Sequence, residues 1–242
     1  MTVTIGRREL LAALGGAMAA WPLAARAQQP GKLPTIGFLG ANTRLVDSQR
    51  LAAFVERLRE LGWIENRTVA IEYRWGEGRN ERFAQFAAEF VRRNVDVIVT
   101  GGTASVIAVK QATSTIPIVF ATAGDPVGTG LVTSLAKPGG NVTGLSAQVP
   151  DLVGKRLELL REVVPGLRRL AILTNIGNPV IVLERDEIRT TAHTIGLEAI
   201  TMEIHRAEDI APAFEALKGG ADALYVPADP LTRPTGRAAD EV

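Results

Sequence analysis

Hydrophobic and polar positions along the chain follow two alternating patterns. Short apolar runs bounded by glycine, proline or polar residues are typical of buried β-strands. These runs predict strands at 35–40, 68–75, 96–102, 116–122, 142–146, 169–175, 197–205 and 222–229. Between them, apolar residues recur every three or four positions, which predicts amphipathic helices. The helical patterns cover 51–61, 83–91, 103–113, 125–135, 153–164, 180–195 and 210–217.

This alternation predicts an α/β fold with parallel sheets, because two parallel strands need a crossover connection such as a helix. The strands are mostly apolar rather than strictly alternating, which favours sheets that are covered on both faces. The turn Lys137-Pro138-Gly139-Gly140 is expected to end the helix at 125–135, and a seam between two lobes follows near 143–152. We therefore expect a first α/β lobe at 28–147 and a second at 148–242.

The first 27 residues have the features of an export signal. Arg7 and Arg8 form a basic start, and the apolar stretch Leu10–Ala20 is too short to cross a bilayer comfortably. Ala25-Arg26-Ala27 fits the small-x-small cleavage pattern, so we expect cleavage near Ala27 and a mature protein in a bacterial periplasm. The paired arginines partly match a twin-arginine signal, which leaves both the Sec and the Tat routes open. The alternative is an amphipathic N-terminal helix of a cytoplasmic protein.

Charge and composition exclude several classes of function. The formal net charge is +1 and aromatic residues make up 5% of the chain, which argues against nucleic acid as a partner. The sequence contains no cysteine, which excludes disulfides, thiolate metal sites and a cysteine nucleophile. A chain without free thiols also suits an oxidising compartment.

The loops after the predicted strands are small and polar, and ligands of open parallel sheets bind beyond the carboxyl ends of the strands. A helix that begins at Thr103 would present free N–H groups and a favourable dipole to a carboxylate. Asp125 and Asp229 could balance an ammonium group. The candidate ligand-binding residues are Asn42, Thr103, Ala104, Ser105, Thr122, Gly124, Asp125, Asn175 and Asp229.

Each candidate also has a purely structural interpretation. Thr103 and Asp125 are ordinary helix N-cap residues, and Pro126 suits the first position of a helix. Asn42, Asn175 and Asp229 could simply stabilise turns. Both interpretations remain open at this point.

The motifs of common enzyme classes are missing from the sequence. The glycine-rich stretch 121–144 contains no phosphate-binding P-loop, and Thr133 occupies the place of the third glycine of a dinucleotide-binding motif. The chain has no G-x-S-x-G nucleophile elbow. The two histidines, His193 and His205, lack the spacing of metal ligands. We therefore expect no enzyme activity, no catalytic residue, no metal and no cofactor.

Four segments together resemble one protein family. They are “PTIGFLG”, “LRELGWIENRTVAIEYRWGEG”, “DVIVTGGTASVIAVKQATSTIPIVFATAGDPVGTGLVTSLAKPGGNVTGLS” and “KRLELLREVVPGLRRLAILTN”. The combination is similar to the periplasmic substrate-binding proteins of ABC importers, in the group that includes tryptophan-binding members. The resemblance extends over nearly all of 33–231, and the stretch from “IPIVF” to “GGNVTG” is its most specific part.

The resemblance implies a type I periplasmic-binding-protein fold, in which two Rossmann-like lobes close on a solute like a hinge. The loops at Asn42, Thr103–Ser105 and Thr122–Asp125 would face the cleft from the first lobe, and Asn175 and Asp229 from the second. In related amino-acid binders, first-lobe hydroxyls and N–H groups hold the carboxylate and a second-lobe acid holds the ammonium. The implied function is capture of a small molecule, with amino acids as one ligand class, for an ABC permease in the inner membrane.

Members of this family usually continue well beyond “ALYVPADPLT”, whereas this chain ends in “RPTGRAADEV”. We therefore expect an incomplete second lobe. Two alternatives follow: a truncated remnant that binds nothing, and a ligand-sensing module for a membrane receptor.

Overall fold

A computed structural model describes residues 32–232 of the chain. The predicted export signal at 1–27 and the residues from 233 onward lie outside the described residues. Within the described range, no helix is both long enough and apolar enough to cross a membrane.

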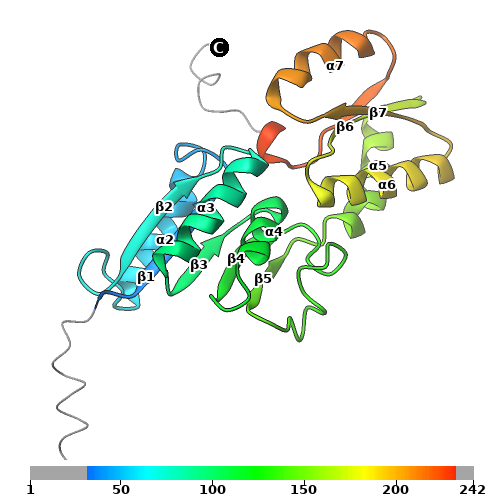
Figure 1. Cartoon of the computed structure of the whole chain (residues 1–242). Helices are drawn as coiled ribbons and strands as arrows, with labels where there is room; N and C mark the ends of the chain where they lie inside the picture. Colours follow the sequence, from blue (N-terminus) through cyan, green and yellow to red (C-terminus); the bar gives the residue numbers. More distant parts are fainter. Residues whose placement is uncertain (1–31, 233–242) are drawn as a thin grey trace, which may run out of the picture. The chain divides into compact units, whose positions relative to one another are not determined.

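The first sheet contains five parallel strands in the order β2-β1-β3-β4-β5 (Figure 1). These strands are β1 (Thr35–Gly40), β2 (Ala70–Trp75), β3 (Val97–Thr100), β4 (Ile118–Ala123) and β5 (Val142–Ser146). All five were expected from the apolar runs, with boundaries that differ by a few residues. The parallel pairing is confirmed.

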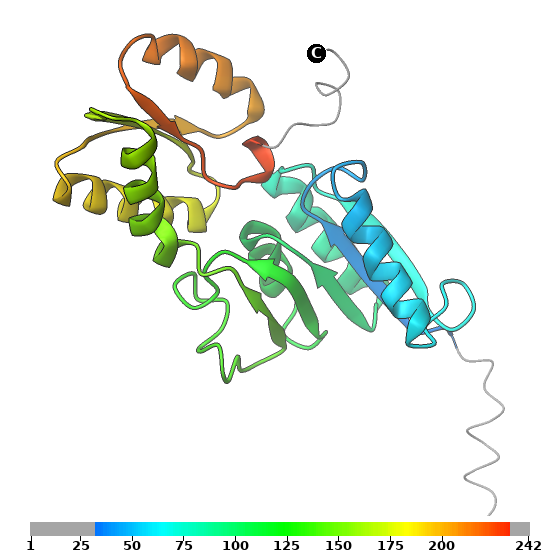
Figure 2. The same cartoon turned by 180° about the vertical axis from the view of Figure 1, so that it is seen from behind.

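Helices cover both faces of this sheet. Helix α2 (Ser48–Glu60) lies on one face, while α3 (Asn80–Arg93) and α4 (Thr103–Ala112) lie on the other (Figures 1 and 2). The apolar stripe predicted for α3 explains why the helix packs here: its residues Phe83, Ala87 and Phe90 are buried. Helix α3 packs closely against β1, since a Cβ atom at Gly37 would lie 2.9 Å from the ring of Phe90.

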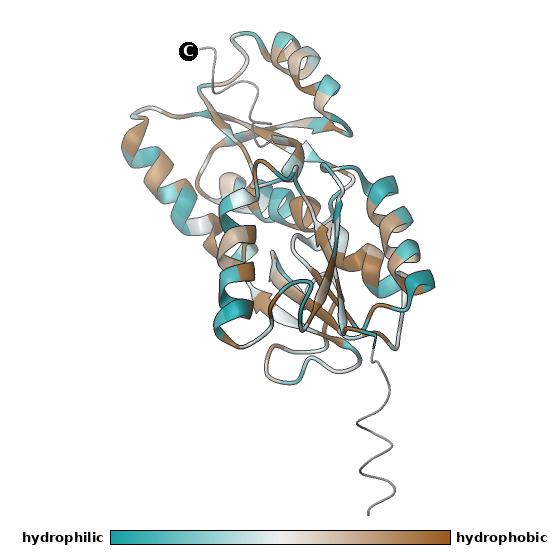
Figure 3. Ribbon diagram, turned by 90° about the vertical axis from the view of Figure 1, so that its left-hand side faces the viewer, coloured by the Kyte–Doolittle hydropathy of each residue, from teal (hydrophilic) through white to brown (hydrophobic). Residues whose placement is uncertain are grey.

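The second sheet has three parallel strands in the order β7-β6-β8. They are β6 (Arg169–Asn175), β7 (Glu198–Ile204) and β8 (Ala223–Tyr225). Helices α5 (Val153–Val163) and α6 (Pro179–Thr194) pack on one face through Leu157 and Ile188. Helix α7 (Ile210–Leu217) packs on the other face, and short 3₁₀ turns occur at Pro150–Leu152, Ala207–Asp209 and Pro230–Thr232. Figure 3 shows the resulting contrast between brown, hydrophobic strands and helices that are partly teal.

The predicted helix at 125–135 is wrong, because this segment forms a series of turns. Asp125 accepts a hydrogen bond from the N–H of Gly128 at 2.8 Å, and the N–H of Thr129 reaches the carbonyl of Asp125, as in a first helical turn. Gly130 then adopts a left-handed φ of +69°, which stops the helix after one turn. Lys110 from α4 donates to the carbonyls of Gly130 and Leu131, so the open turn is held by a side chain.

Two further expectations need correction. The last predicted strand, at 222–229, is shorter than its apolar run, because β8 ends at Tyr225 and residues 226–229 have no regular structure before the 3₁₀ turn at Pro230–Thr232. The first sheet is also not fully covered. Val119 of β4 is 39% exposed and Leu145 of β5 is 71% exposed. On the α2 side of the sheet, these two side chains are therefore not covered by any part of residues 32–232.

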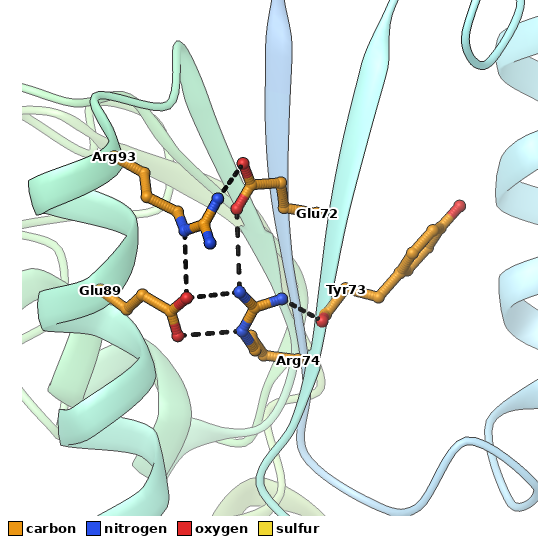
Figure 4. Close-up of polar contacts among 5 residues, drawn as sticks. All are labelled: Glu72, Tyr73, Arg74, Glu89 and Arg93. Atoms are coloured by element: carbon orange, nitrogen blue, oxygen red, sulfur yellow. Dashed lines mark hydrogen bonds and ion pairs between the residues drawn. The ribbon is translucent and has the colours of Figure 1, made fainter.

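The edge strand β2 is fastened to α3 by a cluster of charged side chains (Figure 4). Arg74 pairs with Glu89 through two nitrogens, and Arg93 lies 3.1 Å from Glu89 and 3.2 Å from Glu72. The guanidinium of Arg74 also lies 6.0 Å from the ring centre of Phe90. This cluster therefore ties one face of the edge strand β2 to helix α3.

In each sheet, the strand that comes first in the sequence lies inside the sheet, and later strands lie on both sides of it. The order of strand addition reverses between β1 and β3 in the first sheet and between β6 and β8 in the second. In open α/β sheets a crevice forms at this switch point, beyond the carboxyl ends of the strands. The fold therefore predicts one ligand-binding wall from each sheet.

Candidate ligand-binding site

A cavity of about 350 Å³ lies at the carboxyl ends of the first-sheet strands. Its lining includes the ends of β1, β3 and β4, together with Asn178, Val180, Ile181 and Glu184 at the start of α6 and Ala228 and Pro230 after β8. The volume falls within the range of about 300–1,000 Å³ that is typical of small-molecule sites. The cavity is thus formed by both switch points.

One wall of the cavity is aromatic. Phe38 of β1 and Phe54 of α2 both line the cavity, and their ring centres are 5.6 Å apart. The ring of Trp75 in β2 also contacts Phe38, with ring centres 5.6 Å apart. These side chains give the cavity an apolar wall against which a ligand ring can pack.

A second wall consists of backbone at the start of α4. Gly101, Gly102 and Thr103 line the cavity, and Gly102 adopts φ of +91°, which brings the main chain close to the cavity without a side chain. The first-turn N–H groups of a helix have no partner within the helix and favour an anion. The hydroxyl of Thr103 accepts a hydrogen bond from the N–H of Gly124 at 3.1 Å, which ties the β3 loop to the β4 loop.

Four of the nine predicted residues line this cavity: Asn42, Thr103, Thr122 and Gly124. Ala104 and Ser105 do not line it. The hydroxyl of Ser105 is buried and bonds Thr100 and the carbonyls of Gly101 and Gly102, so it shapes the loop. Asp125 also lies outside the lining and caps its own turn, which agrees with its structural interpretation.

Asn175 and Asp229 are joined to each other rather than to the cavity. The amide nitrogen of Asn175 donates to Oδ1 of Asp229 at 3.0 Å, and both side chains are buried. The second carboxylate oxygen of Asp229 accepts from Nδ2 of Asn178 at 2.8 Å. Asn178 does line the cavity, so Asp229 lies one residue behind it. Direct contact of either residue with a ligand stays a prediction.

The nine predicted residues did not include several residues of the lining, among them Phe38, Phe54, Asn178 and Glu184. Phe38 and Phe54 match the pattern of core positions, and only their place at the end of a sheet distinguishes them from core. Asn178 precedes Pro179, and this pair is typical of a helix start. The sequence therefore gives no sign that Asn178 also lines a cavity. Glu184 sits inside an amphipathic helix and next to a charged run, where an acidic residue looks like part of a solvated face.

Glu184 is in fact almost completely buried, with 1% of its surface exposed. Its Oε1 accepts hydrogen bonds from the Arg156 guanidinium at 2.9 Å and from the Tyr225 hydroxyl at 2.7 Å. Burial raises the pKa of Glu184 against the opposing effect of these two partners, and burial beside Glu184 raises the pKa of Tyr225 to about 12. The tyrosine is therefore a hydroxyl donor at neutral pH.

Among residues 32–232, no three histidine, aspartate or glutamate side chains come together in a way that could hold a metal ion. His193 and His205 lie at exposed positions, on α6 and directly after β7. The cavity instead combines an aromatic wall, a helix start and a few buried acceptor groups, which are the elements of a binding site for a small polar molecule with an apolar part.

Comparison with known proteins identifies the family. The model of the ABC transporter substrate binding protein family matches residues 47–233. The chain belongs to this family. The resemblance drawn from the sequence segments is thereby confirmed.

Three relatives illustrate the similarity. The tyrosine-binding protein of Clostridioides difficile (strain R20291) is 30% identical over 178 residues, which make up 74% of this chain and 51% of that protein. The ABC domain from Streptococcus pneumoniae in complex with L-Trp has a TM-score of 0.73 at 26% identity, over 82% of this chain and 66% of that one. A conserved domain protein of Vibrio cholerae has a TM-score of 0.73 at 28% identity, over 80% and 65% of the two chains.

These similarities confirm the type I periplasmic-binding-protein fold that the sequence predicts. The chain spans about half the length of the curated relative it matches and about two thirds of the solved structures. The ligand, the transport partner and the lobe boundary at 147/148 therefore stay predictions.

Proposed function

We propose that the chain is the extracytoplasmic solute-binding component of an ABC importer, and that it captures an amino acid with an aromatic side chain. The observation that carries this proposal is the cavity of about 350 Å³ with an aromatic wall at the joint switch points of two parallel sheets. The relatives named for tyrosine and L-Trp support the same ligand class. Binding in the cavity would be followed by delivery to a permease of the inner membrane.

The geometry suggests how such a ligand would lie. Its ring would rest on Phe38 and Phe54, where an aromatic contact contributes about 0.5–1.5 kcal/mol beyond the area buried. Its carboxylate would meet the N–H groups at the start of α4, beside Thr103. This arrangement retains Asn42, Thr103, Thr122 and Gly124 as ligand-binding residues.

The test is a thermal-shift and calorimetric survey of the purified chain with L-tyrosine, L-tryptophan, L-leucine and L-glutamate. We expect the two aromatic amino acids to bind and to raise the Tm, because a ligand at 100 times its Kd stabilises the folded chain by about 2.7 kcal/mol. Phe54→Ala should weaken their binding about tenfold, which corresponds to about 1.4 kcal/mol. Phe214→Ala, which alters a ring on α7 that is 44% exposed and outside the cavity lining, is the matched control.

Two results would contradict the proposal. The first is that no amino acid binds to the unaltered chain. The second is that Phe54→Ala and Phe214→Ala have equal effects on aromatic ligands. Transport itself is tested by the uptake of radiolabelled tyrosine or tryptophan into cells with and without the gene for the chain. Equal uptake by both would argue against the role in import.

A further inference from the structure

The parts of the chain that carry the two sheets touch each other beside the cavity, through residues that do not line it. Nδ2 of Asn80, at the start of α3, donates a hydrogen bond to the carbonyl of Gly177 at 2.8 Å. Gly177 lies in the loop between β6 and α6. Neither residue belongs to the cavity lining, whereas the next residue, Asn178, does. The contact therefore lies just outside the space that a ligand would fill.

A second contact lies next to the first. A Cβ built on Gly78 would lie 3.1 Å from Cδ2 of Leu231 and 3.4 Å from Cβ of Pro230. Gly78 comes shortly before α3, and Leu231 lies in the 3₁₀ turn after β8. Gly78 adopts φ of +73°, and its N–H donates to the carbonyl of Ala41 at 2.8 Å, which holds this loop at the end of β1. Two loops that follow strands of the second sheet thus reach the short segment 78–80.

One buried carboxylate organises both of these loops. Asp229 is 2% exposed, and its Oδ1 accepts hydrogen bonds from Nδ2 of Asn175 at 3.0 Å and from the N–H of Leu231 at 2.8 Å. Its Oδ2 accepts from Nδ2 of Asn178 at 2.8 Å. Oδ1 of Asn175 in turn accepts from the N–H of Gly177 at 3.0 Å. Asp229 therefore fixes both the loop that presents the carbonyl of Gly177 and the turn that presents Leu231.

These contacts lie far from the covalent link between the two sheets. Among residues 32–232, the chain passes from the first sheet to the second between β5 and α5. Strand β5 forms one edge of the first sheet, and β2, which precedes Gly78 and Asn80, forms the other. Neighbouring strands lie about 4.8 Å apart, so the two edges are roughly 19 Å apart. Rotation about the link after β5 would separate the β2 edge by the largest distance, so these contacts belong to the closed arrangement.

We propose that Gly78, Asn80, Gly177 and Leu231 form a latch that holds the filled site closed, and that Asp229 is the residue that positions it. The inference rests on the proposed function and deepens it, because it assigns residues that control release of the ligand without touching it. A contact made only in the closed arrangement shifts the equilibrium towards closure. Since a ligand leaves after the two sheets separate, loss of the latch raises the dissociation rate constant.

Stopped-flow dissociation of L-tyrosine from the full chain tests the latch. We expect Asn80→Ala to raise the dissociation rate constant about fivefold, on the scale of one hydrogen bond, and to change the association rate constant less than twofold. Gly177→Ala should have the same effect, because its Cβ would lie 2.9 Å from Nδ2 of Asn80 and displace that side chain. The double variant should be no faster than either single variant, since both remove one contact. Glu81→Ala, at the next exposed position of α3, is the matched control.

Asp229→Asn tests the positioning role. The amide has the size of the carboxylate but can accept hydrogen bonds at one oxygen only, so both loops lose support. We expect the dissociation rate constant to rise at least fivefold, and Asn80→Ala added to this variant should then change it less than twofold. An Asp229 that is merely structural would leave the fivefold effect of Asn80→Ala intact. Asp222→Asn, which also alters a carboxylate bound by backbone N–H groups, is the matched control.

A measurement without ligand separates the latch from the proposed function. The sequence has no cysteine, so spin labels on Arg92→Cys of α3 and Arg189→Cys of α6, both exposed, report one distance across the two sheets. Asn80→Ala should raise the ratio of separated to closed molecules about fivefold. An unchanged ratio or an unchanged dissociation rate constant overturns the inference while the function stands. If the unaltered chain binds neither tyrosine nor tryptophan, the proposed function fails, and the spin-label ratio alone then supports or overturns the latch.

Discussion

At the scale of single residues, the contribution of an ion pair depends on how exposed its charged groups are. Exposed pairs such as Arg57 with Glu60 follow the surface of a helix, where such pairs contribute little. The cluster around Glu89 is different, because one carboxylate meets two guanidinium groups and bridges β2 and α3 (Figure 4). Hydrogen bonds from Arg74, with a smaller contribution from Arg93, lower the pKa of Glu89 to about 2.

This shift makes a prediction about pH. A carboxylate whose pKa is lower in the folded state stabilises the fold fully above its unfolded pKa and loses that contribution as pH falls towards the folded value. Glu89→Gln should therefore reduce the free energy of unfolding by about 1 kcal/mol at pH 7. The difference from the unaltered chain should shrink below about pH 4.5 and vanish near pH 2. Urea unfolding at several pH values measures it.

The control is Glu162→Gln on an exposed position of α5, which should change stability by less than about 0.5 kcal/mol at each pH. A difference for Glu89→Gln that stays constant from pH 7 to pH 3 would show that its ion pairs do not stabilise the folded chain.

At the scale of elements, glycine decides where the helical pattern after Asp125 stops. Gly130 is left-handed, and a Cβ built there would meet nothing within 4 Å. Replacing Gly130 by alanine is therefore expected to lower the free energy of unfolding through backbone conformation and not through a steric clash. Because Lys110 bonds the carbonyl of Gly130 at 2.7 Å, the backbone cannot relax without losing that contact.

We expect Gly130→Ala to destabilise the chain by about 1–2 kcal/mol. Gly154→Ala is a close control, since Gly154 also has free space around its Cβ but lies in α5 without a positive φ. It should stabilise the chain by about 0.5 kcal/mol, because alanine favours helix. Chemical unfolding measures both, and effects of the same sign would contradict this account of the turn.

At the scale of the whole chain, parts of both sheets meet at the cavity. Nδ2 of Asn80 donates to the carbonyl of Gly177 at 2.8 Å, which joins the start of α3 to the loop after β6. Gly124, directly after β4, lies so near Val180 of α6 that an added Cβ would come within 2.5 Å of it. Absence of a side chain at 124 thus allows the two segments to approach across the site.

Gly124→Ala should weaken amino-acid binding about tenfold, because the new methyl group would push Val180 away from the site. The double variant Gly124→Ala/Val180→Ala makes room for that methyl group and should recover affinity to within about threefold of the unaltered chain. Calorimetric titration with L-tyrosine measures each step. A double variant no better than Gly124→Ala would show that the contact between these two residues does not govern binding.

Local pattern was sufficient for most of the fold. Apolar runs such as 169–175 and the stripe through Phe83, Ala87 and Phe90 predicted β6 and α3, because periodicity follows directly from burial. It failed at 125–135, where Gly130 interrupts an otherwise plausible helix, and at the open side of β4 and β5. Covering of a sheet depends on which other segments pack there, and periodicity within one strand does not contain that information.

The sequence by itself determined the α/β class, the family and the strand-end loops that line the cavity. Tertiary structure alone decided which side chains face the cavity. Asp229 and Ser105 looked available but are buried in other contacts, while Glu184 looked like a solvated residue but is buried beside the site. The physical reason is that local pattern reports burial along one element. Hydrogen-bond partners come from residues far apart in sequence, such as Asn178 and Asp229, and only packing brings them together.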